Sequence, residues 1–257
     1  MAENGTVGKA CDVLTLVADF GHPVRFARIQ ARSTLPKATL YRLLQSLTNQ
    51  RMLAYDGAAQ TYAPGMRLVR LAHAAWAQNA LAPAARPFLD RLSRDIPETV
   101  HLAQLDAGQV LYVDKREANK PVDMYSQAGK VAPAYCTGVG KAMLAFLPEP
   151  DLSRALALQS YHRFTDHTLC SERALRAALE DIRLHGVAYD REEHEPGIIC
   201  IAAPILSGGN RVIGALSITT TTTRNSLDGL QSFRPALTKT AQEIGKEAAN
   251  WQFPTQN

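Results

Sequence analysis

The sequence has 257 residues, of which 46% are hydrophobic and 20% charged, and its formal net charge is +4. This length suffices for one large or two modest domains. No apolar run approaches the roughly 20 residues of a membrane span, and the chain begins without a charged-then-apolar leader, so we expect a soluble, cytoplasmic protein. Four scattered cysteines fit neither a disulfide framework nor paired zinc ligands, which predicts reduced, mostly buried thiols and no metal or cofactor.

Basic residues are concentrated in the first third of the chain. Residues 1–80 contain nine Lys or Arg and four Asp or Glu, whereas residues 81–257 contain 19 and 20, respectively. A basic segment attached to a nearly neutral body favours contact with a polyanion, although five surplus charges are also ordinary for a solvated surface.

The first third predicts a helix-turn-helix. Apolar residues recur at helical spacing over residues 8–20, and a Gly-His-Pro run ends this helix. A short second helix is expected over 25–31, a turn over 32–35, and a third helix from Pro36, whose fixed φ suits a first turn. Two helices joined by a four-residue turn have the spacing of a helix-turn-helix.

The third helix has two distinct faces. Its leucines follow the i, i+3, i+4, i+7 pattern and predict a core-facing stripe of Leu40, Leu43, Leu44 and Leu47. At about 100° per residue, the opposite face is centred on Ala38, Arg42, Gln45 and Asn49 and flanked by Thr39, Tyr41 and Ser46. Arg side chains can read guanine, Gln or Asn can read adenine, and Ala and Thr methyls can contact thymine. We therefore expect base contacts from Ala38, Thr39, Tyr41, Arg42 and Gln45, and phosphate contacts from Arg28, Arg32 and Lys37.

A hairpin follows the third helix. Residues 53–64, LAYDGAAQTYAP, contain two short β-prone runs around Asp56-Gly57. A hairpin directly after a recognition helix makes a winged helix-turn-helix, and we place this DNA-binding domain at residues 1–65. A small helical bundle with one polar face is the alternative.

Residues 66–81 are expected to form a linker helix. Small apolar residues recur there at helical spacing, with Trp76 beside them. Such a face packs well against a copy of itself, so one interpretation is a linker that also dimerises, and the other is a plain buried helix. Pro83 and Pro87 follow, and we place the domain boundary near residue 81.

Residues 82–257 predict an α+β domain in which helices flank one antiparallel sheet. We expect an amphipathic helix that ends near Arg94, and β-prone runs at 99–105, 110–115 and 122–126. The remaining expected elements are a helix after Gly138, a helix over 172–184, strands over 198–206 and 212–220, and a last helix over 230–249.

The stretch CTGVGKAML, residues 136–144, resembles part of a phosphate-binding loop. Such a loop needs a glycine five residues before the Gly-Lys pair and a Ser or Thr after it. Tyr135 and Ala142 occupy these positions, which argues against a nucleotide. Small residues that open a helix still offer backbone N–H groups to an anion such as a small carboxylate. A glycine-rich turn that leads into a buried helix is the alternative.

The run DREEHE, residues 190–195, raises the alternative of a metal-dependent or nucleophile-dependent enzyme. Consecutive residues rarely converge on one ion, no HExxH or CxxC motif accompanies them, and charge runs are usually solvated. No Ser, Cys and His form a recognisable nucleophile motif, and Cys136 and Cys200 are better interpreted as small apolar residues of a pocket wall. We therefore expect neither a catalytic nor a metal site.

Three stretches resemble the IclR-type family of bacterial transcriptional regulators. They are LPKATLYRLLQSL from Leu35, AGKVAPAYCTGVGKAMLA from Ala128, and HGVAYDREEHEPGIICIAAPI from His185 with GALSITT after it. The resemblance covers residues 6 to about 250. It implies a GAF-like effector domain that binds a small metabolite, usually an organic acid, and alters the fit of a homodimer or homotetramer on palindromic operator DNA. It favours a repressor over an activator.

The resemblance also implies an effector site. The ligand carboxylate is expected against the backbone of Gly138 and Val139, with two hydroxyls beside it and Asp190 facing a ligand hydroxyl. The full set that matches by motif is Met124, Ala132, Gly138, Val139, Asp190, Ile198, Cys200, Ser217 and Thr219.

The sequence departs from the family pattern at several positions. Thr34 stands where glycine is common, so the turn must form without a residue that tolerates positive φ. Ala38 replaces a common serine and removes one potential hydrogen bond to DNA. Tyr135, Cys136 and Thr219 replace residues frequent in the family, which leaves the effector open.

Overall fold

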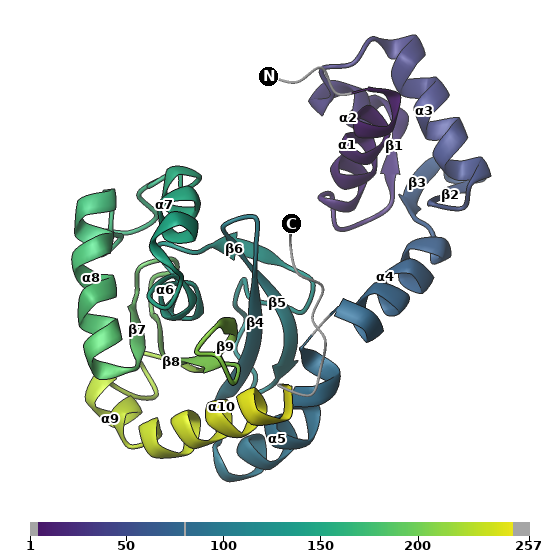
Figure 1. Ribbon diagram of the computed structural model, residues 1–257. Helices are drawn as coiled ribbons and strands as arrows, with labels where there is room; N and C mark the ends of the chain where they lie inside the picture. The colour runs from purple at the N-terminus through teal and green to yellow at the C-terminus, as the bar shows by residue number, and fades with distance from the viewer. Residues whose placement is uncertain (1–4, 80, 249–257) are drawn as a thin grey trace. The chain divides into compact units, whose positions relative to one another are not determined.

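The computed structural model describes residues 5–79 and 81–248. Contacts between residues divide the chain after Gln78 into two compact units, which Figure 1 shows with their helices and strands labelled. The segment expected as a linker forms helix α4 (Met66–Asn79). The predicted bounds at residues 65 and 81 stay predictions, as does the role of α4.

The first unit is a winged helix-turn-helix, as predicted. Its strands form a small antiparallel sheet in the order β1-β3-β2. The two-residue strand β1 was not predicted, because so short a segment has no periodicity. The elements are α1 (Thr6–Ala18), β1 (Val24–Arg25), α2 (Phe26–Arg32), α3 (Lys37–Asn49), β2 (Leu53–Asp56) and β3 (Thr61–Pro64).

The leucine stripe of α3 is the centre of this unit's core. All four of its leucines are buried, and they contact Val13 and Val17 of α1 and Ile29 of α2 in one apolar cluster. Each buried leucine stabilises the fold by about 1.5–3 kcal/mol relative to an exposed one. The stripe therefore determines which side of α3 faces outward.

The turn between α2 and α3 forms without a left-handed residue. Thr34 keeps a negative φ, and the Ser33 hydroxyl accepts a hydrogen bond from the Leu35 N–H at 3.2 Å. Pro36 is the N-cap of α3 (φ −55°) rather than its first helical residue. A side-chain hydrogen bond thus stabilises the turn where the family commonly has glycine.

The second unit is an α+β domain with a six-stranded sheet in the order β6-β5-β4-β9-β8-β7, and every pair of neighbours is antiparallel. The strands are β4 (Thr99–Asp106), β5 (Gln109–Arg116), β6 (Val131–Pro133), β7 (Ala188–Arg191), β8 (Ile198–Leu206) and β9 (Val212–Thr221). The helices are α5 (Ala82–Asp95), α6 (Gly138–Leu144), α7 (Glu149–Ala157), α8 (Glu172–His185), α9 (Leu227–Gln231) and α10 (Arg234–Ala248).

Helices cover both faces of this sheet (Figure 1). Helices α5 and α10 pack against each other, α5 on β4 and β5 and α10 on β8 and β9. On the other face, α6 lies against β7, β8 and β9 and contacts α8. The predicted architecture is therefore confirmed.

Several predicted elements differ in detail. Residues 122–126 form no strand, because β6 already occupies the edge of β5. The last helix is divided at Ser232 and Phe233 into α9 and α10, and its predicted end at Ala249 lies outside the described residues. Pro83 and Pro87 both lie inside α5, Pro83 in its first turn. The short elements α7, β6 and β7 were not predicted.

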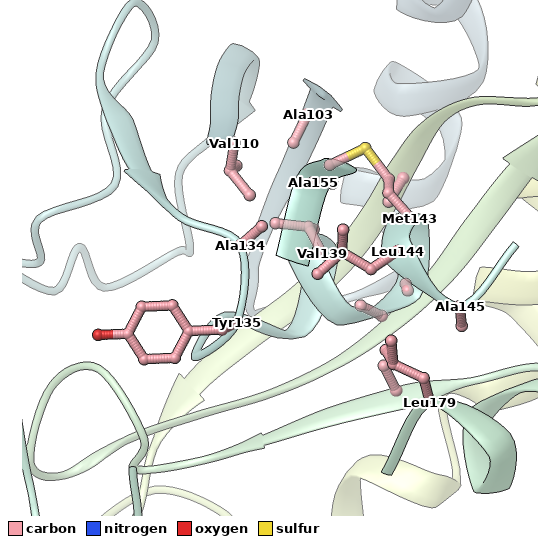
Figure 2. Packing of buried hydrophobic residues seen from close by; sticks show 14 of the residues in the cluster. Ala103, Val110, Ala134, Tyr135, Val139, Met143, Leu144, Ala145, Ala155 and Leu179 are labelled. Carbon is pink, nitrogen blue, oxygen red and sulfur yellow. The ribbon is translucent and has the colours of Figure 1, made fainter. Parts of the chain in front are cut away.

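Helix α6 is the central element of the second unit. All seven of its residues are buried, and Figure 2 shows Val139, Met143 and Leu144 among side chains from the strands and from α8. Gly140 allows this depth, because a Cβ there would lie 2.3 Å from the carbonyl oxygen and 2.5 Å from the Cα of Ala134. Only glycine lets the helix approach that backbone.

We expect Gly140→Ala to lower the free energy of unfolding by about 1–3 kcal/mol, because the added methyl meets backbone atoms that cannot move aside cheaply. Gly209→Ala is the matched control, since a Cβ at Gly209 has no atom within 4 Å. Urea unfolding followed by circular dichroism measures both. Equal stabilities for the two variants would contradict the close approach.

Candidate functional site

The outward face of α3 carries the polar groups that the sequence predicted. Ala38, Tyr41, Arg42 and Gln45 are exposed, whereas Thr39 is half-buried. The Gln45 amide donates a hydrogen bond to the Tyr41 hydroxyl at 2.9 Å, which fixes these two side chains relative to each other. The face thus presents a guanidinium and an amide in positions that suit base edges.

Basic side chains surround this face. Lys37 begins α3, and Arg28 and Arg32 lie on α2, all three exposed. The Arg32 guanidinium stacks over the Phe20 ring, 4.4 Å from its centroid. Residues 5–78 contain nine Lys or Arg and only three Asp or Glu, so this unit is strongly positive and attracts a polyanion.

The second unit encloses a polar cavity of about 30 Å³ at the N-terminal end of α6. A single water molecule needs about 10–15 Å³ of cavity volume. A metabolite is larger than this cavity, so the cavity walls must move outward before one can bind. The cavity is lined by His101, Tyr112, Tyr125, Ser126, Thr137, Gly138, Val139, Asp190, His194, Glu195, Ile198, Cys200, Ser217 and Thr219.

Seven of the nine predicted effector residues line this cavity: Gly138, Val139, Asp190, Ile198, Cys200, Ser217 and Thr219. The other two are buried elsewhere. Ala132 pairs with Val110 across β5 and β6 and belongs to the apolar core, and Met124 is buried away from the cavity wall.

The N-terminus of α6 offers backbone donors to the cavity. The first amides of a helix have no acceptor within it, and the N-cap residue Thr137 does not cap them, because its hydroxyl donates to the Pro133 carbonyl at 2.9 Å. A Cβ at Gly138 would lie 2.4 Å from the Cys200 sulfur. A side chain at Gly138 would therefore displace the cavity wall rather than simply fill the cavity.

His101 of β4 is a cavity residue that was not predicted from the sequence. Its Nδ1 lies 3.2 Å from the Thr219 hydroxyl and its Nε2 2.9 Å from the Ser126 hydroxyl. The pKa of His101 is lowered to about 3, chiefly by burial and also by the nearby positive charge of Lys115, while the Ser126 contact opposes the shift. The ring is thus neutral and bridges two hydroxyls. Its only sequence signal is a polar residue within the apolar strand TVHLAQL.

The run DREEHE is partly buried, which corrects the expectation of a solvated charge run. Lys141 donates a hydrogen bond to Glu193, and both side chains are almost fully buried. Asp190 accepts a hydrogen bond from the Glu193 N–H at 2.8 Å. Burial raises the pKa of Asp190 to about 7, the charge of Lys141 opposes this shift, and that of Glu193 adds to it. Lys141 is therefore an internal counter-ion and not a phosphate ligand.

One wall of the cavity comes from the segment before β6. The Tyr125 N–H donates to both carboxylate oxygens of Glu195, at 3.1 and 3.2 Å. The Tyr125 hydroxyl donates to the Val131 carbonyl at 2.8 Å, and the His194 ring packs edge-on at 5.4 Å between centroids. Together with the contact between Ser126 and His101, these bonds hold the segment closed over the cavity.

The cysteines differ in exposure. Cys136 and Cys200 are buried, Cys170 is half-buried and Cys11 is exposed. Within residues 5–79 and 81–248, no three His, Cys, Asp or Glu side chains are grouped as a metal site requires. None of the helices in these ranges is long and apolar enough to cross a membrane.

A positively charged winged helix-turn-helix joined to a unit with a small polar cavity is the architecture of a DNA-binding regulator with an effector domain. The model of the IclR helix-turn-helix domain matches residues 6–57, and that of the bacterial transcriptional regulator IclR C-terminal domain matches residues 73–246. The chain belongs to the IclR family of bacterial transcriptional regulators. It is a regulator and not an enzyme.

Individual relatives agree with this assignment. The HTH-type transcriptional regulators XynR and KdgR of Escherichia coli (strain K12) are 33% and 31% identical to this chain, over 90% of it in both cases and over 92% and 88% of their own lengths. The crystal structure of the Thermotoga maritima IclR is 26% identical, with a TM-score of 0.75 over 95% of this chain and 98% of that one.

We expect the contribution of His101 to the stability of the second unit to be lost in acid. The unfolded histidine takes up a proton near pH 6.5, whereas the folded one stays neutral down to a pKa of about 3. This contribution to the free energy of unfolding therefore falls below pH 6.5, by about 2 kcal/mol between pH 7 and pH 5. Asp190, whose pKa is raised to about 7, changes the stability in the opposite direction over the same range, so the effect of His101 is the difference between the wild type and His101→Gln. In urea unfolding at several pH values, the free energy of unfolding of the wild type should fall relative to that of His101→Gln as the pH drops. The exposed His167→Gln should retain the wild-type profile, and identical profiles for all three would refute this origin.

Proposed function

We propose that this regulator is a repressor whose affinity for operator DNA is controlled by a small organic acid bound in the cavity beside α6. The observation that carries the proposal is the convergence of uncapped amides at Gly138 and Val139 with the hydroxyls of Ser217 and Thr219 on one buried space. A carboxylate is the small ligand group that such neutral donors suit best.

The proposed DNA contacts follow from the two kinds of side chain around α3. Base readout is assigned to Ala38, Thr39, Tyr41, Arg42 and Gln45. Phosphate contacts, which position the protein without selecting a sequence, are assigned to Arg28, Arg32 and Lys37. A palindromic operator fits a symmetric oligomer, and the cytoplasm, where the DNA lies, is the proposed location.

Helix α4 is the proposed linker and association surface. Met66, Val69 and Leu71 are 78%, 60% and 46% exposed, and exposed apolar side chains on one helix favour packing against a second copy. This supports a homodimer or homotetramer with DNA-binding domains at residues 1–65, linkers at 66–81 and effector domains at 82–257.

Acid binding in this cavity depends on neutral partners. Neither lysine nor arginine is among the described residues that line it, whereas Asp190 and Glu195 are. A bound carboxylate is therefore attracted by the helix N-terminus and by hydroxyls. The raised pKa of Asp190 lets this group bind as a neutral acid that donates a hydrogen bond, and its ionisation would repel the ligand.

The first functional prediction separates base readout from phosphate contacts. Arg42→Ala should cost about 1–3 kcal/mol on an operator selected from a random-sequence library and relax its specificity, whereas Lys37→Ala should weaken operator and random duplex alike. Fluorescence anisotropy at several salt concentrations measures both. Equal losses of the two variants on both duplexes would show that the faces of α3 are assigned wrongly.

The second functional prediction concerns pH. Native mass spectrometry of protein purified from its own host identifies the acid, and operator binding is then titrated with that acid between pH 6 and pH 8. The affinity for the acid should fall as the pH rises through about 7, because Asp190 then loses its proton. Asp190→Asn keeps an oxygen for the Glu193 N–H, cannot ionise and should abolish this dependence. A wild-type affinity that does not change over this range would contradict the role of Asp190.

A further inference from the structure

The first unit also contains a concave surface that adjoins the polar face of α3. It is a groove of about 760 Å³ between the N-terminal end of α3 and the hairpin β2–β3. Phe26 and Tyr62 contribute its apolar lining, and Arg25 lies at the junction of β1 and α2. The volume lies in the range of ligand-binding clefts. The groove therefore has room for a partner.

Exposed aromatic rings line both sides of this groove. Tyr41 of α3 is 49% exposed and Tyr55 of β2 is 46% exposed. Each ring packs against a second one, Tyr41 with Phe26 at 6.0 Å and Tyr55 with Tyr62 at 4.8 Å between centroids. The rings are thus fixed while their outer parts face solvent. Rigid aromatic surface with a hydroxyl at its edge is typical of contact surfaces.

The charge of the groove identifies its partner. Arg25 and Lys37 line it and are exposed, and no described acidic side chain lines it. Asp56, the acidic residue of the hairpin, accepts hydrogen bonds from the Ala58 and Ala59 N–H groups at 2.9 and 3.1 Å. The groove is therefore uniformly positive and complementary to an anion.

We propose that this groove holds the sugar–phosphate backbone of one DNA strand. Arg25 and Lys37 pair with its phosphates, and the Tyr55 hydroxyl donates a hydrogen bond to a phosphate oxygen while the ring lies against deoxyribose. Tyr41 and the neighbouring Ala38 belong to both the groove and the polar face of α3. A strand read by α3 consequently continues into the groove. This inference rests on the DNA-binding function and adds Arg25 and Tyr55 to the contacts.

The contact is independent of base sequence, so a random-sequence 30-base-pair duplex is a sufficient probe. Fluorescence anisotropy of the full chain across a salt series gives the affinity and its salt dependence. Arg25→Ala should weaken binding about eightfold at 0.1 M salt and reduce the slope of log K against log salt by about 0.9, the value for one phosphate contact. Tyr55→Phe keeps the ring packed against Tyr62 and should weaken binding about threefold through the lost hydroxyl.

Arg70→Ala is the matched control, because Arg70 is an exposed arginine on α4 outside the groove. It should keep the wild-type slope. A slope for Arg25→Ala equal to that for Arg70→Ala, or wild-type binding by Tyr55→Phe, would overturn the proposal. Groove variants that bind DNA normally but change the oligomeric state or the response to the acid would overturn it too, in favour of a second copy or a small molecule. Failure of the wild-type protein to bind any duplex would instead refute the DNA-binding function itself.

Discussion

The second unit depends on the close approach of α6 to the backbone before it. Because Gly140 has no side chain, the helix lies against the Ala134 backbone and all of its residues are buried. This depth places the amides of Gly138 and Val139 at the cavity. It also buries the Lys141 ammonium, which then needs Glu193 as a partner, since an unpaired buried charge is strongly destabilising. The acidic run DREEHE and the glycine-rich stretch CTGVGKAML are thus joined by the buried ion pair between Glu193 and Lys141.

The first unit obeys a simpler constraint. Burial of one leucine stripe fixes the rotation of α3 about its axis, and this rotation leaves Arg42 and Gln45 on the outside. The same rotation brings Tyr41 beside Phe26 and so forms one side of the groove next to the hairpin. One apolar pattern therefore determines both the polar face and the aromatic surface beside it.

Features that depend on local periodicity could be predicted from the sequence. The helix α3 and the hairpin were predictable because the leucine spacing and the Asp56-Gly57 turn are encoded within a few residues. The cavity was predictable only in part, through the family motif. The bridge from His101 to Ser126 and Thr219 joins three separate segments, and no local pattern encodes such a contact. The prediction of a strand at 122–126 was wrong for the same reason. Whether a segment forms an edge strand depends on which distant segment pairs with that edge, and here β6 pairs with β5.

The His101 bridge has a consequence for the sensitivity of the regulator. The neutral ring donates from one nitrogen and accepts at the other, so one of the two hydroxyls of Ser126 and Thr219 gives its proton to His101. Under the proposed function, an acid that needs this proton must replace the imidazole as its acceptor. The imidazole thus acts as a built-in competitor for the ligand. Under the proposed function, its hydrogen bonds subtract from the affinity for the acid, and the regulator responds when the acid accumulates rather than when traces are present. The concentration of acid at which such a sensor responds therefore depends on two sets of hydrogen bonds. They are the bonds within the free protein that break on binding and the bonds to the ligand that form.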